Sequence, residues 1–234
     1  MSGPAAPRVL IVADGDGVAA GIAAVLASVP ERPFTIAADG GAAQALAAGL
    51  APDLVIGDRD SLAPEAAALL AARGIPIERA PVMKDESDTE LCIAAARARG
   101  ARWIRLVGAL GGPRVEHAVA NLGLLALPAL DGVDVAIVAP PSTIRRAGRT
   151  DGPGSLALAG APGDHVSLLP LAGPVAGVTT DGLLYPLRDE PLLPGPARGL
   201  SNALVGTGAT VHVGRGVLLV IQTPADPRSQ EAHP

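Results

Sequence analysis

The chain has 234 residues, enough for one large domain or two modest ones. Hydrophobic residues make up 49% of it and aromatic residues only 1%, so its core has to be built from Ala, Val, Leu and Ile. The net charge of −5 argues against a general nucleic-acid-binding protein, and no stretch approaches the roughly 18 unbroken apolar residues that a membrane span needs. No signal peptide is apparent, and a single cysteine, Cys92, fits a reducing compartment, so we expect a cytoplasmic protein.

From residue 8 to residue 139, short β-like runs alternate with Ala-rich helical stretches. The expected strands are Arg8–Ala13, Phe34–Ala38, Leu54–Ile56, Ile75–Arg79, Trp103–Val107 and Val133–Ala139. The expected helices are 18–28, 42–48, 63–73, 88–99 and 115–127. This alternation predicts an α/β fold, a mostly parallel sheet with helices on both faces. Ligands of such sheets bind beyond the carboxyl ends of the strands, so we expect the functional residues in the joints that follow the strands.

The pattern changes at Pro140-Pro141, after which no long helical period follows. Short β-like runs punctuated by Gly and Pro are expected at Thr143–Arg146, Ser155–Ala159, His165–Pro170, Gly177–Leu187, Thr210–Val213 and Val217–Gln222. These runs predict a smaller all-β sandwich or roll. We therefore expect an α/β nucleotide-binding catalytic domain over 1–141, an all-β substrate-binding domain over 142–223 and a polar tail over 224–234.

The first two joints are rich in glycine. Gly15–Gly21 nearly matches a dinucleotide-binding loop, but the spacing is off by one residue and a tight turn is the favoured interpretation. In the second joint, Asp39-Gly40-Gly41, the glycines either let backbone N–H groups approach a phosphate at a helix N-terminus or simply turn the chain. The residues alone leave both alternatives open.

The third joint places two carboxylates, Asp58 and Asp60, directly after a buried-type strand, with Arg59 between them and Ser61 following. One interpretation is a polar turn in which Asp60 or Ser61 caps the next helix. The other is a site for a hard cation, because such ions take carboxylate oxygens as ligands.

The fourth joint, Lys84–Glu90, favours the cation. Ser87 and Glu90 form a capping box and mark a helix start, but they leave Asp85, Asp88 and the chain's only lysine, Lys84, unexplained. If the strands that precede the third and fourth joints are neighbours in the sheet, the carboxylates of both joints converge, and a divalent ion offsets their repulsion. The ammonium of Lys84 could then reach a phosphate.

Two further segments carry polar residues in a Gly-rich setting. The fifth joint contains Gly111, Gly112, Arg114, Glu116 and His117 ahead of a helix, which suits a phosphate or nucleotide contact, although His117 alone is more often structural. In the β region, Ser201 and Asn202 could hydrogen-bond to the edge of a heterocycle, or simply form a turn. Asn202 and Asn121 are the chain's only asparagines, and a residue type that is this rare in a chain often meets a specific need where it occurs.

Taken in order, these segments resemble the thiamine pyrophosphokinase family, whose pattern runs A-D-G-G, G-D-x-D-S, K-D-x-T-D-x-E, G-G-R-x-D-H and G-x-S-N. They stand here as Ala38–Gly41, Gly57–Ser61, Lys84–Glu90, Gly111–His117 and Gly199–Asn202. The resemblance covers about residues 34 to 223. It implies an α/β catalytic domain, a β-sandwich domain, a homodimer with active sites at the subunit interface, and Mg²⁺-dependent conversion of ATP to AMP.

The resemblance also implies roles for individual residues. Asp58, Asp60 and Asp88 would bind Mg²⁺, with Asp85 close by. The triphosphate would be held by Lys84 and by the Gly-rich segments, that is by Asp39, Gly40, Gly41, Gly111, Gly112, Arg114 and His117. Glu116, Ser201 and Asn202 would contact thiamine.

Three departures from the family pattern stand out. Arg59 replaces a Phe, Ser87 replaces a Thr, and Pro113 lengthens the fourth segment by one residue while Glu116 replaces an Asp. Two alternatives therefore remain beside thiamine pyrophosphokinase. One is the same chemistry on another small alcohol, such as a hydroxymethylpterin, and the other is a non-catalytic protein that binds thiamine or a nucleotide.

Overall fold

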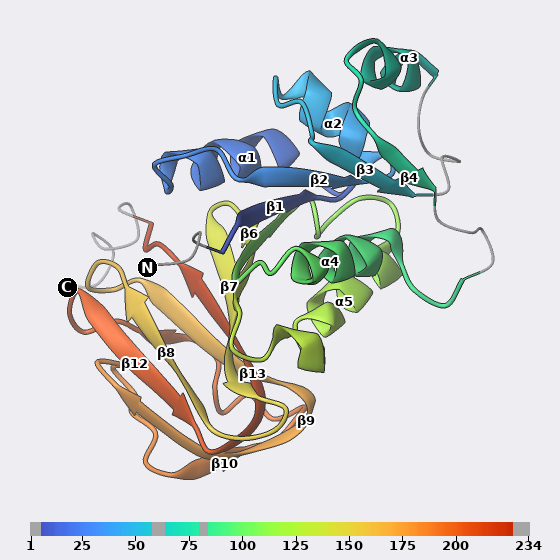
Figure 1. Ribbon diagram of the computed structural model, residues 1–234. Coiled ribbons are helices and arrows are strands. Elements are labelled where there is room, and N and C mark those ends of the chain that lie inside the picture. Colours follow the sequence, from blue (N-terminus) through green and yellow to red (C-terminus); the bar gives the residue numbers. More distant parts are fainter. Residues whose placement is uncertain (1–5, 58–63, 80–83, 227–234) are drawn as a thin grey trace, which may run out of the picture. The chain divides into compact units, whose positions relative to one another are not determined.

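The computed structural model describes residues 6–57, 64–79 and 84–226 (Figure 1). Asp58 and Asp60, which the sequence assigns to the cation site, and Arg59 between them lie outside the described residues. By its contacts the chain forms two compact units. The first contains residues 1–124 and 132–140, and the second contains residues 125–131 and 141–234.

The first unit is built on a parallel sheet. Its strands are β1 (Arg8–Val12), β2 (Phe34–Ala38), β3 (Leu54–Gly57), β4 (Ile77–Arg79), β5 (Trp103–Val107) and β6 (Asp134–Ala139). Their order is β4-β3-β2-β1-β5-β6, and every neighbouring pair is parallel. Val9–Val12 and Ile36–Ala38 are almost entirely buried. Their continuous apolar sequences are typical of strands that are covered on both faces.

Helices cover both faces of this sheet. They are α1 (Val18–Ala27), α2 (Gly41–Ala47), α3 (Pro64–Ala72), α4 (Asp88–Ala98) and α5 (Val115–Leu124). Helices α1, α2 and α3 lie on one face, and α4 and α5 lie on the other (Figure 1). A core cluster of Ala, Val, Leu and Ile side chains, among them Ile22, Val25, Ala45 and Leu70, lies beneath α1, α2 and α3, with Trp103 packed against it. The predicted α/β arrangement is confirmed for this part of the chain.

In its described residues, 125–131 and 141–226, the second unit is all-β apart from one short 3₁₀ turn at Pro128–Leu130. Its strands are β7 (Ser142–Arg149), β8 (Gly154–Ala159), β9 (His165–Asp181), β10 (Glu190–Leu192), β11 (Asn202–Ala203), β12 (Gly208–Val213) and β13 (Arg215–Thr223). Their order is β7-β13-β9-β12-β8, with β10 and β11 also paired to β9. A core of buried Val and Leu side chains, among them Val166, Leu168, Val211 and Leu218, fills this unit. The predicted all-β part is thereby confirmed.

The long strand β9 corrects one sequence prediction. We expected separate runs at His165–Pro170 and Gly177–Leu187, but one strand extends from His165 to Asp181 and residues 182–187 lie outside it. Ala172 (φ +61°) and Gly173 (φ +130°) kink the chain. Strand β13 pairs with β9 up to Leu171 and again at Ala176 after a register shift, and β12 pairs with β9 at Thr179–Asp181. Turn-forming residues here bend a strand rather than end it.

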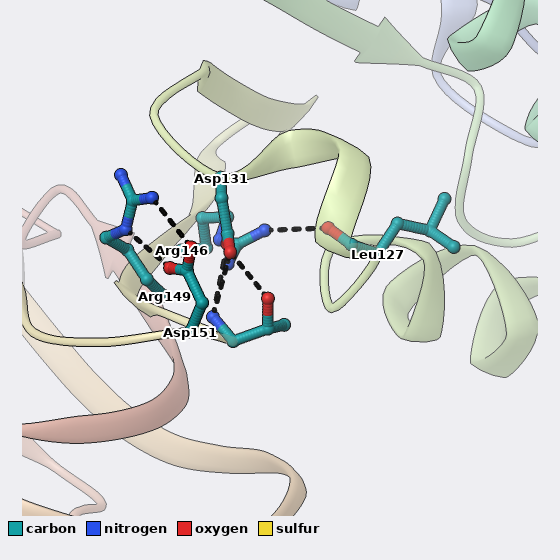
Figure 2. Close-up of polar contacts among 6 residues, drawn as sticks. Leu127, Asp131, Arg146, Arg149 and Asp151 are labelled. Carbon is teal, nitrogen blue, oxygen red and sulfur yellow. Dashed lines mark hydrogen bonds and ion pairs between the residues drawn. The ribbon is translucent and has the colours of Figure 1, made fainter.

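The end of helix α5 differs from the sequence prediction as well, and the residues that follow it, 125–131, belong to the β unit. The helix ends at Leu124 instead of 127, in keeping with the disfavoured helical conformation of a residue before proline, here Pro128. Figure 2 shows how the next residues are fastened: the buried Arg146 guanidinium contacts Asp131 at 2.5 Å and donates to the carbonyl of Leu127 at 3.1 Å. Burial lowers the pKa of Arg146, while the neighbouring carboxylate opposes that shift.

None of the described helices has both the length and the apolar character that crossing a membrane requires.

Candidate functional site

The candidate site lies where the strands of the parallel sheet end. Strands β3 and β4 are parallel neighbours, with Gly57 opposite Arg79. The segment beginning with Asp58 and the segment leading to Lys84 therefore leave adjacent strands, as the cation hypothesis requires. The positions of Asp58 and Asp60 themselves are not described, so their convergence with Asp85 and Asp88 stays a prediction.

The loop after β2 holds a buried carboxylate. Asp39 is 7% exposed, has a left-handed backbone (φ +41°), and its N–H donates to the carbonyl of Ile56 at 2.9 Å. A β-carbon at Gly57 would lie 2.7 Å from the β-carbon of Asp39, and one at Gly41 would lie 2.2 Å from the carbonyl oxygen of Val12. The glycines of this segment are therefore required by close packing of neighbouring strands, whatever they contact in a ligand.

The loop after β1 brings two carboxylates to the same rim that sequence reasoning did not single out. Asp14 accepts a hydrogen bond from Gln44 Nε2 at 2.7 Å and lies against Gly40, where a β-carbon would be 2.4 Å from its Oδ2. Asp16 accepts one from the N–H of Gly112 at 2.9 Å. Their alternation with glycines in Asp14-Gly-Asp16-Gly was the only signal available, and a tight turn explained it equally well.

The start of α4 is built as the sequence predicts. Ser87 caps the helix, its hydroxyl accepting the N–H of Glu90 at 3.2 Å. Lys84 forms an ion pair with Oδ1 of Asp88, and their side chains are 13% and 25% exposed. Asp85 is exposed. The ammonium and the Asp88 carboxylate thus meet at the end of the sheet, which leaves the other oxygen of Asp88 for a cation.

The loop between β5 and α5 carries most of the altered fourth segment. Arg114 Nε donates to Glu116 Oε1 at 2.8 Å, and this hydrogen bond is the main reason why the pKa of Glu116 lies below its usual range. Both side chains and that of His117 are exposed. The loop is fastened from the helix by Asn121, whose Nδ2 donates to the carbonyl of Ala109 at 2.8 Å. The extra proline therefore sits in an anchored loop with an exposed polar tip.

In the β unit, the segment Gly199–Asn202 is tightly held. A β-carbon at Gly199 would lie 2.1 Å from the carbonyl oxygen of Leu168, and Ser201 is an exposed residue with φ +58°. The buried Asn202 amide is engaged within the chain: Oδ1 accepts the N–H groups of Tyr185 and Ala203, each at 2.9 Å, and Nδ2 donates to the carbonyl of Tyr185 at 2.7 Å. Asn202 thus fixes the backbone of the chain's only tyrosine, which is 58% exposed.

The described carboxylates fit Mg²⁺ in part. No cluster of three or more potential ligands occurs among residues 6–57, 64–79 and 84–226. Protein Mg²⁺ sites, however, commonly use one or two carboxylates together with waters and substrate phosphates. Asp88, partly exposed and partly neutralised by Lys84, has the donor chemistry for such a site, and the remaining ligands would come from the segment after β3.

Family profiles match both units. The profile described as "Thiamin pyrophosphokinase, catalytic domain" matches residues 27–137, and "Thiamin pyrophosphokinase, vitamin B1 binding domain" matches residues 156–218. The chain belongs to the thiamine pyrophosphokinase family. The first four segments fall within the catalytic-domain match and the fifth falls within the vitamin B1 binding match.

Individual thiamine pyrophosphokinases support this membership. The Bacillus subtilis enzyme is 23% identical over 194 residues, covering 82% of this chain and 88% of its own. Thiamine pyrophosphokinase 2 of rice is 24% identical over 176 residues, covering 73% of this chain; the match spans 65% of the rice protein's length, just under two thirds. The resemblance to the family is thereby confirmed, and both of these relatives are named as enzymes.

Solved structures share the fold. The thiamine pyrophosphokinase of Bacillus subtilis superposes with a TM-score of 0.79 at 23% identity, covering 94% of this chain and 100% of that one. The enzyme of Geobacillus thermodenitrificans gives a TM-score of 0.76 at 27% identity, covering 94% and 99%. The two-part architecture of this chain is therefore that of the family.

Proposed function

We propose that the protein is a cytoplasmic, Mg²⁺-dependent thiamine pyrophosphokinase, which transfers a pyrophosphoryl group from ATP to the hydroxyl of thiamine and releases AMP. The observation that carries the proposal is the pair of matched domains in one chain, together with the polar residues that end the strands of the first. The hydroxyl oxygen would attack the β-phosphorus in line, and the bond to the α-phosphate oxygen would break. Positioning and charge neutralisation supply most of the catalysis in such transfers.

Lys84 and Asp88 are the described residues that we assign most directly to this chemistry. We assign Mg²⁺ to Asp88 with Asp58 and Asp60; when bound, the ion would neutralise charge on the transferring phosphates. Lys84 already holds one oxygen of Asp88 and would orient that carboxylate while offering its ammonium to a phosphate oxygen. Asp85, exposed beside them, is our candidate for accepting the hydroxyl proton late in the reaction, with Glu116 as the other candidate.

The nucleotide contacts are assigned to the loops after β2 and β5. Asp39, Gly40 and Gly41 form the first, and Gly111, Gly112, Arg114 and His117 belong to the second. The guanidinium of Arg114 is exposed, and in the contacts described only its Nε is bound, by Glu116. Its remaining N–H groups could therefore donate to a phosphate of the nucleotide.

Thiamine is assigned to the β unit. The exposed Ser201 would contact it, whereas Asn202 would act through Tyr185, whose backbone N–H and carbonyl both hydrogen-bond to the Asn202 amide. An exposed tyrosine ring attracts a cation over its face, and thiamine carries a cationic ring. Asn202 would then be a positioning residue in the substrate site rather than a direct contact.

A homodimer is proposed on the distribution of exposed apolar side chains. In the described part of the chain, Val115 and Val119 of α5 are 75% and 65% exposed, and Leu184, Leu193, Leu200 and Val205 are 45–57% exposed in the β unit. Apolar surface of this kind is often covered by association. Sedimentation analysis that found only monomers at micromolar concentration would contradict the dimer.

The proposal is tested with purified protein, ATP, Mg²⁺ and thiamine. We expect AMP and thiamine diphosphate in equal amounts, and we expect Asp88→Asn and Asp60→Asn to abolish both while the circular-dichroism spectrum stays that of the parent. Near-normal turnover in both variants would contradict the assignment of the metal. Turnover of a hydroxymethylpterin in place of thiamine would reassign the acceptor, and tight binding without AMP release would show a non-catalytic relative.

A further inference from the structure

The loop after β1 lies between two glycine-rich loops, because β1 lies between β2 and β5 in the sheet. It presents one carboxylate to each. Asp14 is directed to the loop after β2, through Gln44 and Gly40. Asp16 is directed to the loop after β5, although 96 residues separate it from its partner Gly112.

Backbone hydrogen bonds join the loop of Asp16 to the loop after β5. The N–H of Gly15 donates to the carbonyl of Gly108 at 2.7 Å, and the N–H of Asp16 donates to that of Leu110 at 2.8 Å. The carboxylate then reaches past this pairing, and its Oδ2 accepts the N–H of Gly112 at 2.9 Å. The tip of the loop is thus held by a charged side chain rather than by strand pairing.

The glycine pair fits this carboxylate closely. Gly111 and Gly112 have φ values of +75° and +78°, a backbone conformation that only glycine adopts freely. A β-carbon at Gly111 would lie 2.3 Å from Oδ2 of Asp16, whereas one at Gly112 would meet nothing closer than 3.8 Å. The first glycine therefore provides space for the carboxylate, and the second donates its N–H to it.

We propose that Asp16 is a positioning residue of the nucleotide site: it fixes Gly111-Gly112 and so sets the direction in which Arg114 and the start of α5 leave the loop. This inference rests on the proposed function. The fourth segment has an additional residue, Pro113, relative to the family pattern, and a longer loop has more conformations to exclude. Because the N–H of Gly112 is donated to Asp16, contact with the nucleotide falls to other groups of the loop, Arg114 foremost.

Amide hydrogen exchange in the ligand-free protein tests the positioning directly. Replacing Asp16 by Ala should speed exchange at Gly112 by roughly tenfold to a hundredfold, the range expected for loss of a hydrogen bond to a charged group. Asp16→Asn keeps an oxygen that accepts the N–H and should fall between Asp16→Ala and the parent. Asp14→Ala removes the same charge from the same loop without touching Gly112, so exchange there should stay that of the parent.

Calorimetric titration with Mg²⁺-ATP then tests the consequence. Asp16→Ala should weaken ATP binding about fivefold to tenfold, with partial rescue in Asp16→Asn and with thiamine affinity unchanged. Gly111→Ala should weaken ATP binding more than Gly112→Ala, because both share a strained φ but only the first meets the carboxylate.

Each result decides the proposal. Unchanged exchange at Gly112 in Asp16→Ala would overturn the positioning, and faster exchange with unchanged ATP affinity would overturn its link to the nucleotide. Neither measurement, hydrogen exchange or ATP affinity, depends on turnover. A protein that forms no thiamine diphosphate would refute the proposed reaction, while exchange and ATP affinity would still decide the role of Asp16.

Discussion

Replacing Asn202 by Ala should separate a structural role of this residue from direct contact with the substrate. The substitution removes three hydrogen bonds, of 2.9, 2.9 and 2.7 Å, from a side chain that is 6% exposed. A hydrogen bond contributes about 1 kcal/mol, so the loss should lower the free energy of unfolding by about 3 kcal/mol. Because Tyr185 is itself exposed, water will replace part of this and about 2 kcal/mol is the lower expectation.

Urea denaturation followed by circular dichroism measures the effect. For a urea dependence of about 2 kcal/mol per molar, the midpoint should fall by about 1 to 1.5 M. Asn121→Ala is the matched control, since the other asparagine of the chain is also buried but loses a single described bond, to Ala109. Its midpoint should fall by about 0.5 M.

Thiamine titration of the same variants completes the test. If Asn202 acts through Tyr185, Asn202→Ala and Tyr185→Ala should both weaken thiamine binding, and only the first should also lose stability. The reasoning is refuted if Asn202→Ala unfolds at the urea concentration of the parent while thiamine binding is lost, because that pattern belongs to a direct ligand contact.

Three further predictions test the packing and electrostatics of the fold. Gly57→Ala should destabilise by about 1 to 3 kcal/mol, since its β-carbon would lie 2.7 Å from that of Asp39, whereas Gly123→Ala, in open space on α5, should be neutral or stabilising in thermal melts. Arg146→Met, which leaves the Asp131 carboxylate, 10% exposed, without its cation, should cost about 3 to 5 kcal/mol in urea denaturation; a loss below 1 kcal/mol would contradict a stabilising role of that pair. Burial by itself would raise the pKa of Asp164, but hydrogen bonds from two backbone N–H groups and one side-chain amide outweigh it and lower that pKa, so its charged form stabilises the fold above about pH 4 and that contribution is lost as the pH falls further. Asp164→Asn should therefore be less stable than the parent at pH 7 and approach it below pH 4, and a stability gap that does not change with pH would contradict this.

The strand and helix alternation of the first unit was predictable because each element is short and periodic and ends at a Gly- or Asp-rich joint. Capping was predictable for the same local reason, as Ser87 and Glu90 are three residues apart. The β unit was harder to predict. The sequence predicted a strand that ends at Pro170, but pairing with β13 and β12, which lie far along the chain, carries β9 on to Asp181.

The roles that sequence missed all depend on distant partners. Nothing local marks Asp16, whose partner Gly112 lies 96 residues away, and nothing local links Asn202 to Tyr185. The rarity of asparagine was the better signal: both asparagines of the chain, Asn121 and Asn202, fasten a loop that carries a family segment or a candidate contact. Hydrogen bonds between loops of different strands become visible only once the sheet order is known.

The most direct measurement of the proposed reaction follows the phosphorus atoms of ATP by ³¹P NMR in the presence of Mg²⁺ and thiamine. Attack at the β-phosphorus predicts that the ATP signals are replaced by those of AMP and of a diphosphate ester in equal amounts, and that no ADP accumulates. Appearance of ADP with a thiamine monophosphate, or ATP signals that stay constant beside bound thiamine, would contradict it.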